Sequence, residues 1–270
     1  DEHRLIADGL PTPGEVLLYG KRHRGAAAGK QRENNSNGYQ QVIRPDYDQF
    51  KQLTGEGSII PVVKTLLADT ETPVSAYLKI RDRSTFNFLL ESVEGGEKVA
   101  RYSFLGADPY MIFRSRGKSG TIRDLTTGRE RRFEGDPIKE LRGVMNRYKT
   151  VNIPGLPRFT GGGVGYVAYD AVRLVEDIPD TTRDDYLIDD IFFMFFDTIL
   201  VFDTIGHTIS IISNVHTDGE GTLEDRYREA VTRIETLESF LAKKKAVEPS
   251  KGRGHNAPVP NMDREAYMKS

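Results

Sequence analysis

Four glycines in five residues, Gly161-Gly162-Gly163-Val164-Gly165, form the pattern in this sequence that could most readily bind a phosphate. A Walker-type loop needs Gly-Lys-Ser/Thr after its glycines, because backbone N–H groups and an ammonium group must meet the phosphates. Here Tyr166-Val167-Ala168-Tyr169-Asp170 follows, which lacks lysine and reads as a strand, whereas a dinucleotide-binding loop needs a helix there. We therefore predict that these glycines let a strand pack closely against another backbone.

Nucleophilic and metal-binding side chains offer no second candidate. The 270-residue chain contains no cysteine, which excludes thiolate nucleophiles, disulfides, Cys-ligated zinc and iron–sulfur clusters. Its five histidines are scattered, and His207 and His216 lie at the two ends of one expected strand, roughly 30 Å apart at ~3.3 Å per residue. We expect neither a metal site nor a catalytic triad from the spacing of these residues.

Two stretches carry strong local charge although the formal net charge is only −2. Residues 114–132 hold seven Arg or Lys and two acidic residues, without interleaved aromatic side chains on which bases could stack. Residues 176–190 hold seven carboxylates and one arginine, without the pattern of a calcium loop. We interpret the first stretch as a solvated β-hairpin and the second as a solvated loop suited to a basic partner, and we expect no binding to nucleic acid.

The elements that must position these residues predict an α+β fold. Short apolar segments separated by Gly, Asp and Pro are typical of an antiparallel meander. We expect strands at Ile59–Leu67, Pro73–Ile80, Phe86–Ser92, Ala100–Leu105, Tyr110–Arg116, Thr121–Leu125, Arg131–Glu134, Gly162–Asp170, Phe192–Asp203 and His207–Val215. Helical spacing of apolar residues predicts helices at 45–53, 136–149 and 223–245. The expected fold is an antiparallel β-sheet, a meander or a sandwich, flanked by helices.

The chain divides into four parts by composition. Residues 1–43 contain a long stretch with little apolar content and form a disordered or unassigned leader. Residues 44–245 hold the expected domain, and residues 246–260, with three prolines and two glycines, form a linker. Residues 261–270 look like the first turn of a helix that is cut off. No run reaches the ~18–20 apolar residues of a membrane helix, and no signal peptide is visible.

Two motifs in a β context are specific. They are Leu-Leu-Glu-Ser at 89–92 and Arg-Tyr-Ser-Phe-Leu-Gly at 101–106. Together with residues 68–78, 159–166 and 169–170, they closely resemble the N-terminal region of anthranilate synthase component I, the chorismate-using subunit. The resemblance covers about 44–216 and 261–270, where the last residues resemble the entry to the chorismate-binding domain. It implies that residues 44–245 are the N-terminal, regulatory part of that fold.

The resemblance also implies an activity. The family converts chorismate plus glutamine or ammonia to anthranilate and pyruvate, with Mg²⁺, in the tryptophan pathway of the cytoplasm. The magnesium ligands and catalytic groups belong to the C-terminal domain, beyond residue 270, so we expect no catalytic residue here and an inactive chain in isolation. The implied partner is the glutamine amidotransferase subunit, component II, in a hetero-oligomer.

The resemblance assigns a feedback-inhibitor site to this region. The Leu-Leu-Glu-Ser segment of the family helps to bind L-tryptophan, and it matches residues 89–92. The residues expected at the site are Leu90, Glu91 and Ser92, with Tyr102 and Ser103 from the neighbouring strand. A strand can aim Leu90 and Ser92 into one cavity, because residues two apart share a face, while Glu91 neutralises the ammonium group. Without the resemblance, the leucines read as ordinary core.

Two alternatives stay open at this point. The motifs also resemble aminodeoxychorismate synthase component I, the nearest relative, although the Glu-Gly-Gly-Glu insert at 94–97 favours the anthranilate enzyme. The second alternative is an amino-acid-binding regulatory module without any catalysis. Product analysis separates the two enzymes, and the sequence that follows residue 270 separates an enzyme from a binding module.

Overall fold

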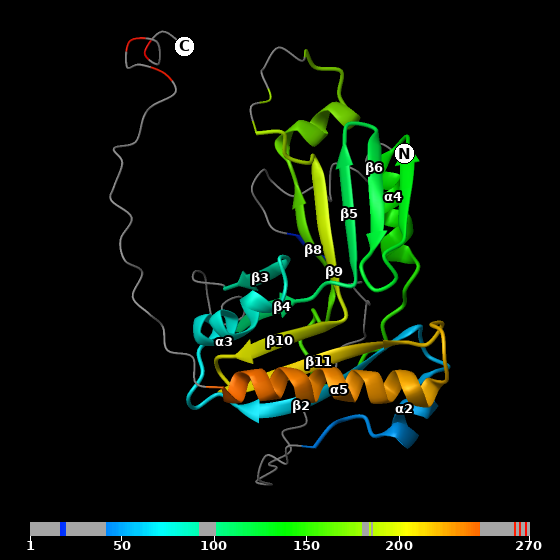
Figure 1. Ribbon diagram of the computed structural model, residues 1–270, viewed down its shortest axis with the longest axis vertical. Coiled ribbons are helices and arrows are strands. Elements are labelled where there is room, and N and C mark those ends of the chain that lie inside the picture. Colours follow the sequence, from blue (N-terminus) through cyan, green and yellow to red (C-terminus); the bar gives the residue numbers. More distant parts are fainter. Residues whose placement is uncertain are drawn as a thin grey trace, which may run out of the picture.

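Two antiparallel sheets form the centre of the molecule. The structure is a computed structural model, and it describes residues 17–19, 42–91, 101–179, 184, 186–243, 262, 265 and 268. The six-stranded sheet has the order β1 (Leu17–Tyr19), β8 (Gly162–Val167), β9 (Ile191–Phe196), β5 (Met111–Arg116), β6 (Ser119–Asp124), β7 (Glu130–Glu134). The five-stranded sheet has the order β2 (Ile59–Leu67), β11 (Thr208–His216), β10 (Thr198–Asp203), β4 (Tyr102–Ala107), β3 (Asn87–Leu90). Figure 1 shows the second sheet lying across one end of the first. The expected α+β class with antiparallel sheets flanked by helices is confirmed.

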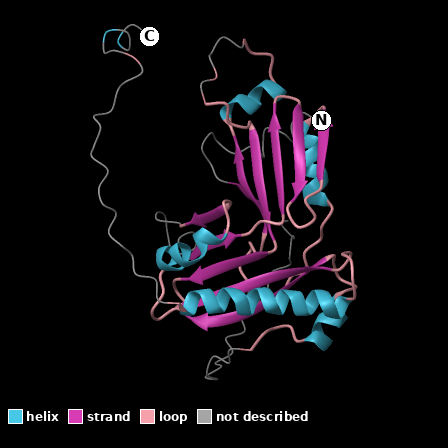
Figure 2. Ribbon diagram, viewed as in Figure 1, coloured by secondary structure: helices cyan, strands magenta, loops and turns pink. Residues whose placement is uncertain are grey.

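Helices cover the outer face of the five-stranded sheet (Figure 2). They are α2 (Tyr47–Leu53), α3 (Pro73–Ile80) and α5 (Leu223–Ala242), and a 3₁₀ turn, η1 (Arg81–Arg83), follows α3. The apolar stripe of α5, with Ala230, Ile234 and Leu237, packs on Leu200 and Ile211 of the sheet in one buried cluster. Because the stripe repeats every three to four residues, one side of the helix faces the core and the other faces water.

Two further apolar clusters complete the layers. One lies between the sheets and joins Val164 and Phe196 of the six-stranded sheet to Val201 and Ile212 of the five-stranded sheet. The other lies on the far face of the six-stranded sheet, under α4 (Pro137–Asn146) and the 3₁₀ helix η2 (Tyr169–Leu174). None of the helices in the described part of the chain is long and apolar enough to span a bilayer.

The segment Pro73–Ile80 is a helix, α3, so the strand predicted there is wrong. Its apolar residues fit a two-residue alternation, but the first turn decides the conformation. The Thr72 hydroxyl accepts a hydrogen bond from the Ser75 N–H at 3.1 Å, and the Ser75 hydroxyl accepts one from the Thr72 N–H at 2.9 Å. This reciprocal capping, followed by proline at the first helical position, starts a helix.

The single strand predicted over Phe192–Asp203 is two strands in different sheets. β9 ends at Phe196 in the six-stranded sheet, and β10 begins at Thr198 in the five-stranded sheet. Asp197 lies between the two strands and interrupts the apolar sequence. At this residue the chain passes from the six-stranded sheet to the five-stranded sheet, although the β pattern of the sequence is continuous. Alternation alone cannot show this crossing, because both strands keep a period of two.

The leader contains one element that the sequence did not predict. Leu17–Tyr19 forms β1 and pairs antiparallel with Gly163–Gly165 of β8. Three further parts of the chain lie outside the described residues: the rest of residues 1–41, the linker 246–260 and most of 261–270. Within 261–270, Glu265 and Met268 are described, and both are helical.

The glycines of β8 let its neighbours approach closely, as predicted. A Cβ atom on Gly165 would collide with the backbone carbonyl oxygen of Phe192 in β9. A Cβ atom on Gly163 would press on the rings of Phe193 and Phe195. The glycine run is therefore a packing feature of a central strand, with β1 on one side and β9 on the other.

Candidate functional site

The predicted inhibitor-binding residues lie where β3 and β4 run side by side. Leu90 ends β3 and pairs with Phe104 of β4, and Tyr102 begins β4. Glu91 follows directly after β3 with its side chain exposed to solvent. Ser92 and the insert at 94–97 lie outside the described residues.

The structure divides these residues between two faces of the sheet. Leu90 and Tyr102 pack against the cluster between the sheets. Ser103 points the other way, because successive residues of a strand face opposite sides; it is only 8% exposed and pairs with Phe202, which packs under the helices. A ligand between the sheets would therefore meet Leu90 and Tyr102 but not the side chain of Ser103.

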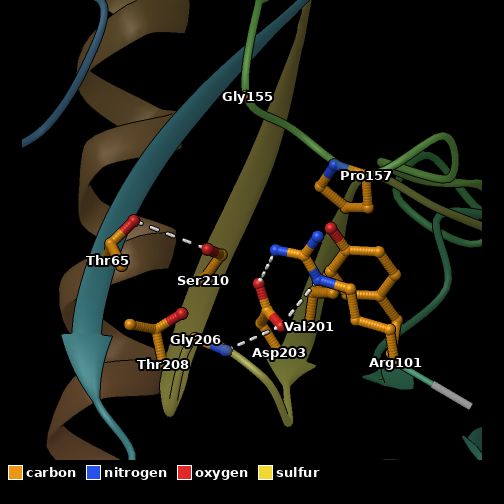
Figure 3. A pocket seen from close by; sticks show the side chains of 10 residues that line it. Thr65, Arg101, Gly155, Pro157, Val201, Asp203, Gly206, Thr208 and Ser210 are labelled. Carbon is orange, nitrogen blue, oxygen red and sulfur yellow. Dashed lines mark hydrogen bonds and ion pairs between the residues drawn. The ribbon is translucent and has the colours of Figure 1, made fainter. Parts of the chain in front are cut away.

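A cleft of about 250 Å³ is lined in part by Tyr102 and Val201, and it lies on the face of the sheet that also carries Leu90. Figure 3 shows the cleft from close by. Four strands of the five-stranded sheet form its floor, and the connection from α4 to β8 borders it. The lining residues are Thr65, Arg101, Tyr102, Gly155, Pro157, Val201, Asp203, Gly206, Thr208 and Ser210. Among the residues predicted for the site, the cleft contains Tyr102.

An ion pair between Arg101 and Asp203 forms the charged part of the cleft. Nε of Arg101 donates to Oδ1 of Asp203 at 2.9 Å, and Nη2 donates to Oδ2 at 2.6 Å. Oδ1 also accepts hydrogen bonds from the N–H groups of Ile205 at 3.1 Å and Gly206 at 3.0 Å. The hydrogen bonds from Arg101 are the main reason why the pKa of the Asp203 carboxyl is lowered. The same contact raises the pKa of Arg101.

Sequence reasoning missed these cleft residues apart from Tyr102. Thr65, Asp203 and Ser210 lie far apart in the chain, on β2, β10 and β11, and the strand pairing brings them together. The one available signal was Arg101, which begins the Arg-Tyr-Ser-Phe-Leu-Gly motif.

The connection between α4 and β8 covers the apolar part of the same face. Phe159 is buried and meets the ring of Phe104 edge to face, with ring centroids 5.5 Å apart. Nδ2 of Asn214 on β11 donates to the carbonyl oxygen of Thr160 at 2.8 Å. These contacts hold the connection against the sheet, and Gly155 and Pro157 border the cleft farther along it.

His216, at the opposite end of β11 from the cleft, belongs to a second polar group, and its side chain is partly buried. Its Nε2 lies 2.6 Å from Oδ1 of Asp197, and the rings of Tyr110 and Tyr148 meet its ring at 5.4 and 4.8 Å. Burial lowers the pKa of His216, but the hydrogen bond and charge of Asp197 outweigh burial, so the pKa is raised above 6.5. His207 precedes β11 at its other end, so the two histidines are apart, as predicted.

The two charged stretches pair with each other. Arg114 bonds to Asp189 at 2.8 Å, and Arg116 forms an ion pair with Asp184. The acidic stretch thus has basic partners within this chain. No group of three or more His, Asp or Glu residues in the described part of the chain could hold a metal ion.

Comparison with known proteins identifies relatives of the chain. No protein-family model matches it. It is 41% identical over 196 residues to "Anthranilate synthase component 1" of Acetivibrio thermocellus and 37% identical over 198 residues to the protein of that name from Synechocystis sp.. A crystal structure of anthranilate synthase component I from Streptococcus pneumoniae shares 24% identity at a TM-score of 0.42, covering 64% of this chain and 36% of that chain. Each of the two curated alignments covers 73% of this chain and only 39% of the relative. The resemblance that the motifs indicate is confirmed.

Proposed function

Because 73% of this chain is related to part of anthranilate synthase component 1, we propose that it is the regulatory region of a chorismate-utilising lyase of tryptophan biosynthesis. The reaction converts chorismate and glutamine or ammonia to anthranilate and pyruvate. The observation that carries this proposal is the 41% identity over 196 residues. The names of the relatives favour anthranilate over aminodeoxychorismate as the product.

We propose further that this region binds L-tryptophan as a feedback inhibitor, on the face between the sheets. Leu90 and Tyr102 supply apolar surface on one side of the sheet, and Glu91 is exposed at the end of β3. Burial of the indole ring would supply most of the binding free energy. Inhibition would be allosteric, so tryptophan must bind the inactive arrangement more tightly than the active one.

Catalysis in this proposal takes place outside the chain. Mg²⁺ would be bound by the part of the protein that the curated relatives carry beyond the region they share with this chain. The described residues lack a cluster suited to the ion, so no step is assigned to them. The proposed partner is the glutamine amidotransferase, component II, in a cytoplasmic hetero-oligomer.

An activity assay tests whether the catalytic groups lie outside this chain. The chain alone, with chorismate, Mg²⁺ and either ammonia or glutamine plus component II, should release no anthranilate, which its fluorescence would reveal. Measurable turnover would show that catalytic groups lie within this chain.

Tryptophan binding tests the regulatory role. The chain contains no tryptophan, so indole fluorescence excited beyond the tyrosine band reports on the ligand alone. Tyr102→Ala should weaken binding about tenfold through loss of ring contact. Ser103→Ala is the matched control on the opposite face and should bind as the wild type does. Equal affinity in the wild type and in Tyr102→Ala would remove Tyr102 from the site.

A further inference from the structure

The chain passes between the two sheets at two places that lie beside each other, near the end of β11. β9 gives way to β10 at Asp197, where Figure 1 shows one strand leading into the next, and β4 gives way to β5 over residues 108–110. The N–H group of Asn214 donates to the carbonyl oxygen of Asp197 at 2.8 Å, and that of Tyr110 donates to the carbonyl oxygen of Phe195 at 2.8 Å. Each passage is therefore tied to a neighbouring strand.

The side chain of His216 contacts both passages and a third segment. Its Nε2 atom lies 2.6 Å from Oδ1 of Asp197. Its ring meets the ring of Tyr110, just before β5, with centroids 5.4 Å apart, and the ring of Tyr148, just after α4, with centroids 4.8 Å apart. Beyond Tyr148 the chain runs from the layer of α4 to the start of β2. We call the groups that meet here the joint: Tyr110, Tyr148, Asp197, Asn214 and His216.

The interaction between His216 and Asp197 depends on one proton. The two side chains are 18% and 21% exposed, so water and salt screen their attraction less than that of a surface pair. A protonated imidazole donates a charge-assisted hydrogen bond to the carboxylate, which is shorter and stronger than the bond from a neutral imidazole. Loss of the proton therefore weakens the contact without removing either side chain.

Other charges around the joint modify this contact but do not reverse it. Burial favours the neutral ring, yet the hydrogen bond and charge of Asp197 outweigh burial and raise the pKa of His216. Asp218 also favours the protonated ring, and Arg233 opposes it. The charged groups that face the joint besides Asp197 are Asp218 after β11, Arg226 and Arg233 of α5, Arg147 after α4 and Asp124 of β6.

The joint also contains a buried polar atom whose hydrogen bonding is incomplete. Asn214 is 4% exposed, and its Nδ2 atom donates to the carbonyl oxygen of Thr160 at 2.8 Å. Its Oδ1 atom is buried and accepts no hydrogen bond from the described residues. A buried acceptor without a donor costs free energy, and contact with water would relieve that cost. Local opening is therefore easier here than in a fully apolar part of the sheet.

We propose that the joint is a proton-sensitive switch between the two sheets. When His216 is protonated, its ion pair with Asp197 holds the ends of β9, β10 and β11 closed. When His216 is neutral, the joint opens locally more often, while the face covered by α5 stays folded. Histidine is suited to this role because its charge changes near neutral pH.

Hydrogen exchange of backbone amides in the ¹⁵N-labelled 270-residue chain tests the switch. The amides of Tyr110 and Asn214 should exchange through a local opening, so their protection should depend little on urea, because such an opening exposes little surface. The amides of Leu200 and Ile211, under the helices, should follow global unfolding. After correction for the intrinsic effect of pH, opening at Tyr110 and Asn214 should become about tenfold more frequent between pH 6 and a pH well above the titration of His216. This is the difference between a charged and a neutral hydrogen bond.

His216→Gln keeps a polar side chain but does not titrate, so opening at the joint should be frequent at both pH values. The matched control is His207→Asn at the other end of β11. His207 is exposed and has a φ of 49°, which asparagine tolerates, so this variant should keep the pH dependence of the wild type. Circular dichroism verifies that each variant is folded.

Asp197→Asn tests the partner of the proton. It keeps an acceptor but removes the charge, so the titration midpoint of the His216 ring, followed by NMR, should fall. A midpoint that stays the same in this variant would overturn the proposal. So would exchange at Tyr110 and Asn214 that has the same urea dependence as exchange at Leu200 and Ile211, because the joint would then open only with the whole fold. Local opening that does not change with pH in the wild type would also overturn it.

Discussion

The two faces of the five-stranded sheet are built from alternate residues of the same strands, yet they differ in character. The face under α2, α3 and α5 is apolar over most of its length, with Leu105, Leu200 and Ile211 fully buried. The opposite face is apolar at its centre, around Val201 and Ile212. It becomes polar at one end in the cleft and at the other end around His216.

The difference separates a face that contributes mainly to stability from a face whose two ends are polar. A face covered by amphipathic helices can exclude water along its whole length, so its residues contribute mainly through burial. The second face is covered by another sheet that crosses it, and its ends extend beyond that cover (Figure 1). Polar side chains at those ends remain in reach of solvent and ligands.

Truncation on the helix-covered face should have the largest effect. Ile211→Ala removes a fully buried side chain of β11 and should lower the free energy of unfolding by about 4 kcal/mol through lost burial and the cavity left behind. Ser210→Ala, the neighbouring position on the cleft face, should change it by less than about 1 kcal/mol. Urea unfolding measures both. Similar losses at the two positions would contradict the division between the faces.

The apolar centre of the second face should respond nearly as strongly. Phe159→Ala removes a ring that is 5% exposed and packs on Phe104, and we expect a loss of about 3 kcal/mol. Pro157→Ala lies in the same connection but borders the cleft, so its cost should stay below about 1 kcal/mol. Thermal and urea unfolding test the pair. A large loss for Pro157→Ala would show that the cleft end is packed like a core.

His216 should make stability depend on pH at the far end of that face. Asp197 raises the pKa of His216 in the folded chain above 6.5, so the stabilisation is fully present below the unfolded pKa of about 6.5 and is lost as pH rises through the folded pKa. His216→Gln should lose about 2 kcal/mol at pH 6 and less above the folded pKa. His207→Asn, at the other end of β11, is the control, and urea titrations across this range measure the slope. If the free energy of unfolding of the wild type does not change with pH across this range, His216 does not make stability depend on pH.

The smallest effect should come from the Arg101–Asp203 pair. The pKa of Asp203 is lowered in the folded chain, so its stabilisation is present above the unfolded pKa of about 3.9 and is lost as pH falls through the lower folded pKa. Because Arg101 is 41% exposed, Asp203→Asn should lower stability at pH 7 by less than about 1 kcal/mol. The variant should also show a weaker loss of stability in acid, as followed by circular dichroism. A loss of several kcal/mol at pH 7 would show that the Arg101–Asp203 pair contributes to stability as strongly as a buried core residue.

Several parts of the fold follow from local sequence. The hairpin of β10 and β11 and the helix α5 were predicted from apolar periodicity, and the structure confirms them within a few residues. The glycines before Tyr166 were predicted to allow close packing, and Gly165 does so against β9. Local patterns succeed at these places because apolar residues recur with the period of the element that they form.

The failures have local causes as well. Pro73–Ile80 fits both a strand and a helix by apolar spacing, and the cap at Thr72 and Ser75 settles it. The inhibitor-binding residues stay a prediction, and the structure places Leu90 and Tyr102 on one face of the sheet and Ser103 on the other. Tyr102 and Ser103 are neighbours in β4, and successive residues of a strand point to opposite faces of the sheet.

The sequence by itself determined the fold class, most of the helices and strands of residues 44–245 and the relationship to anthranilate synthase component I, because periodicity and short motifs are properties of neighbouring residues. Only the tertiary structure decided that β9 and β10 part at Asp197 and that Arg101, Asp203 and Ser210 border one cleft. Such neighbours depend on which distant strands pair and in which register. A shift of one residue would turn every side chain of a strand to the opposite face.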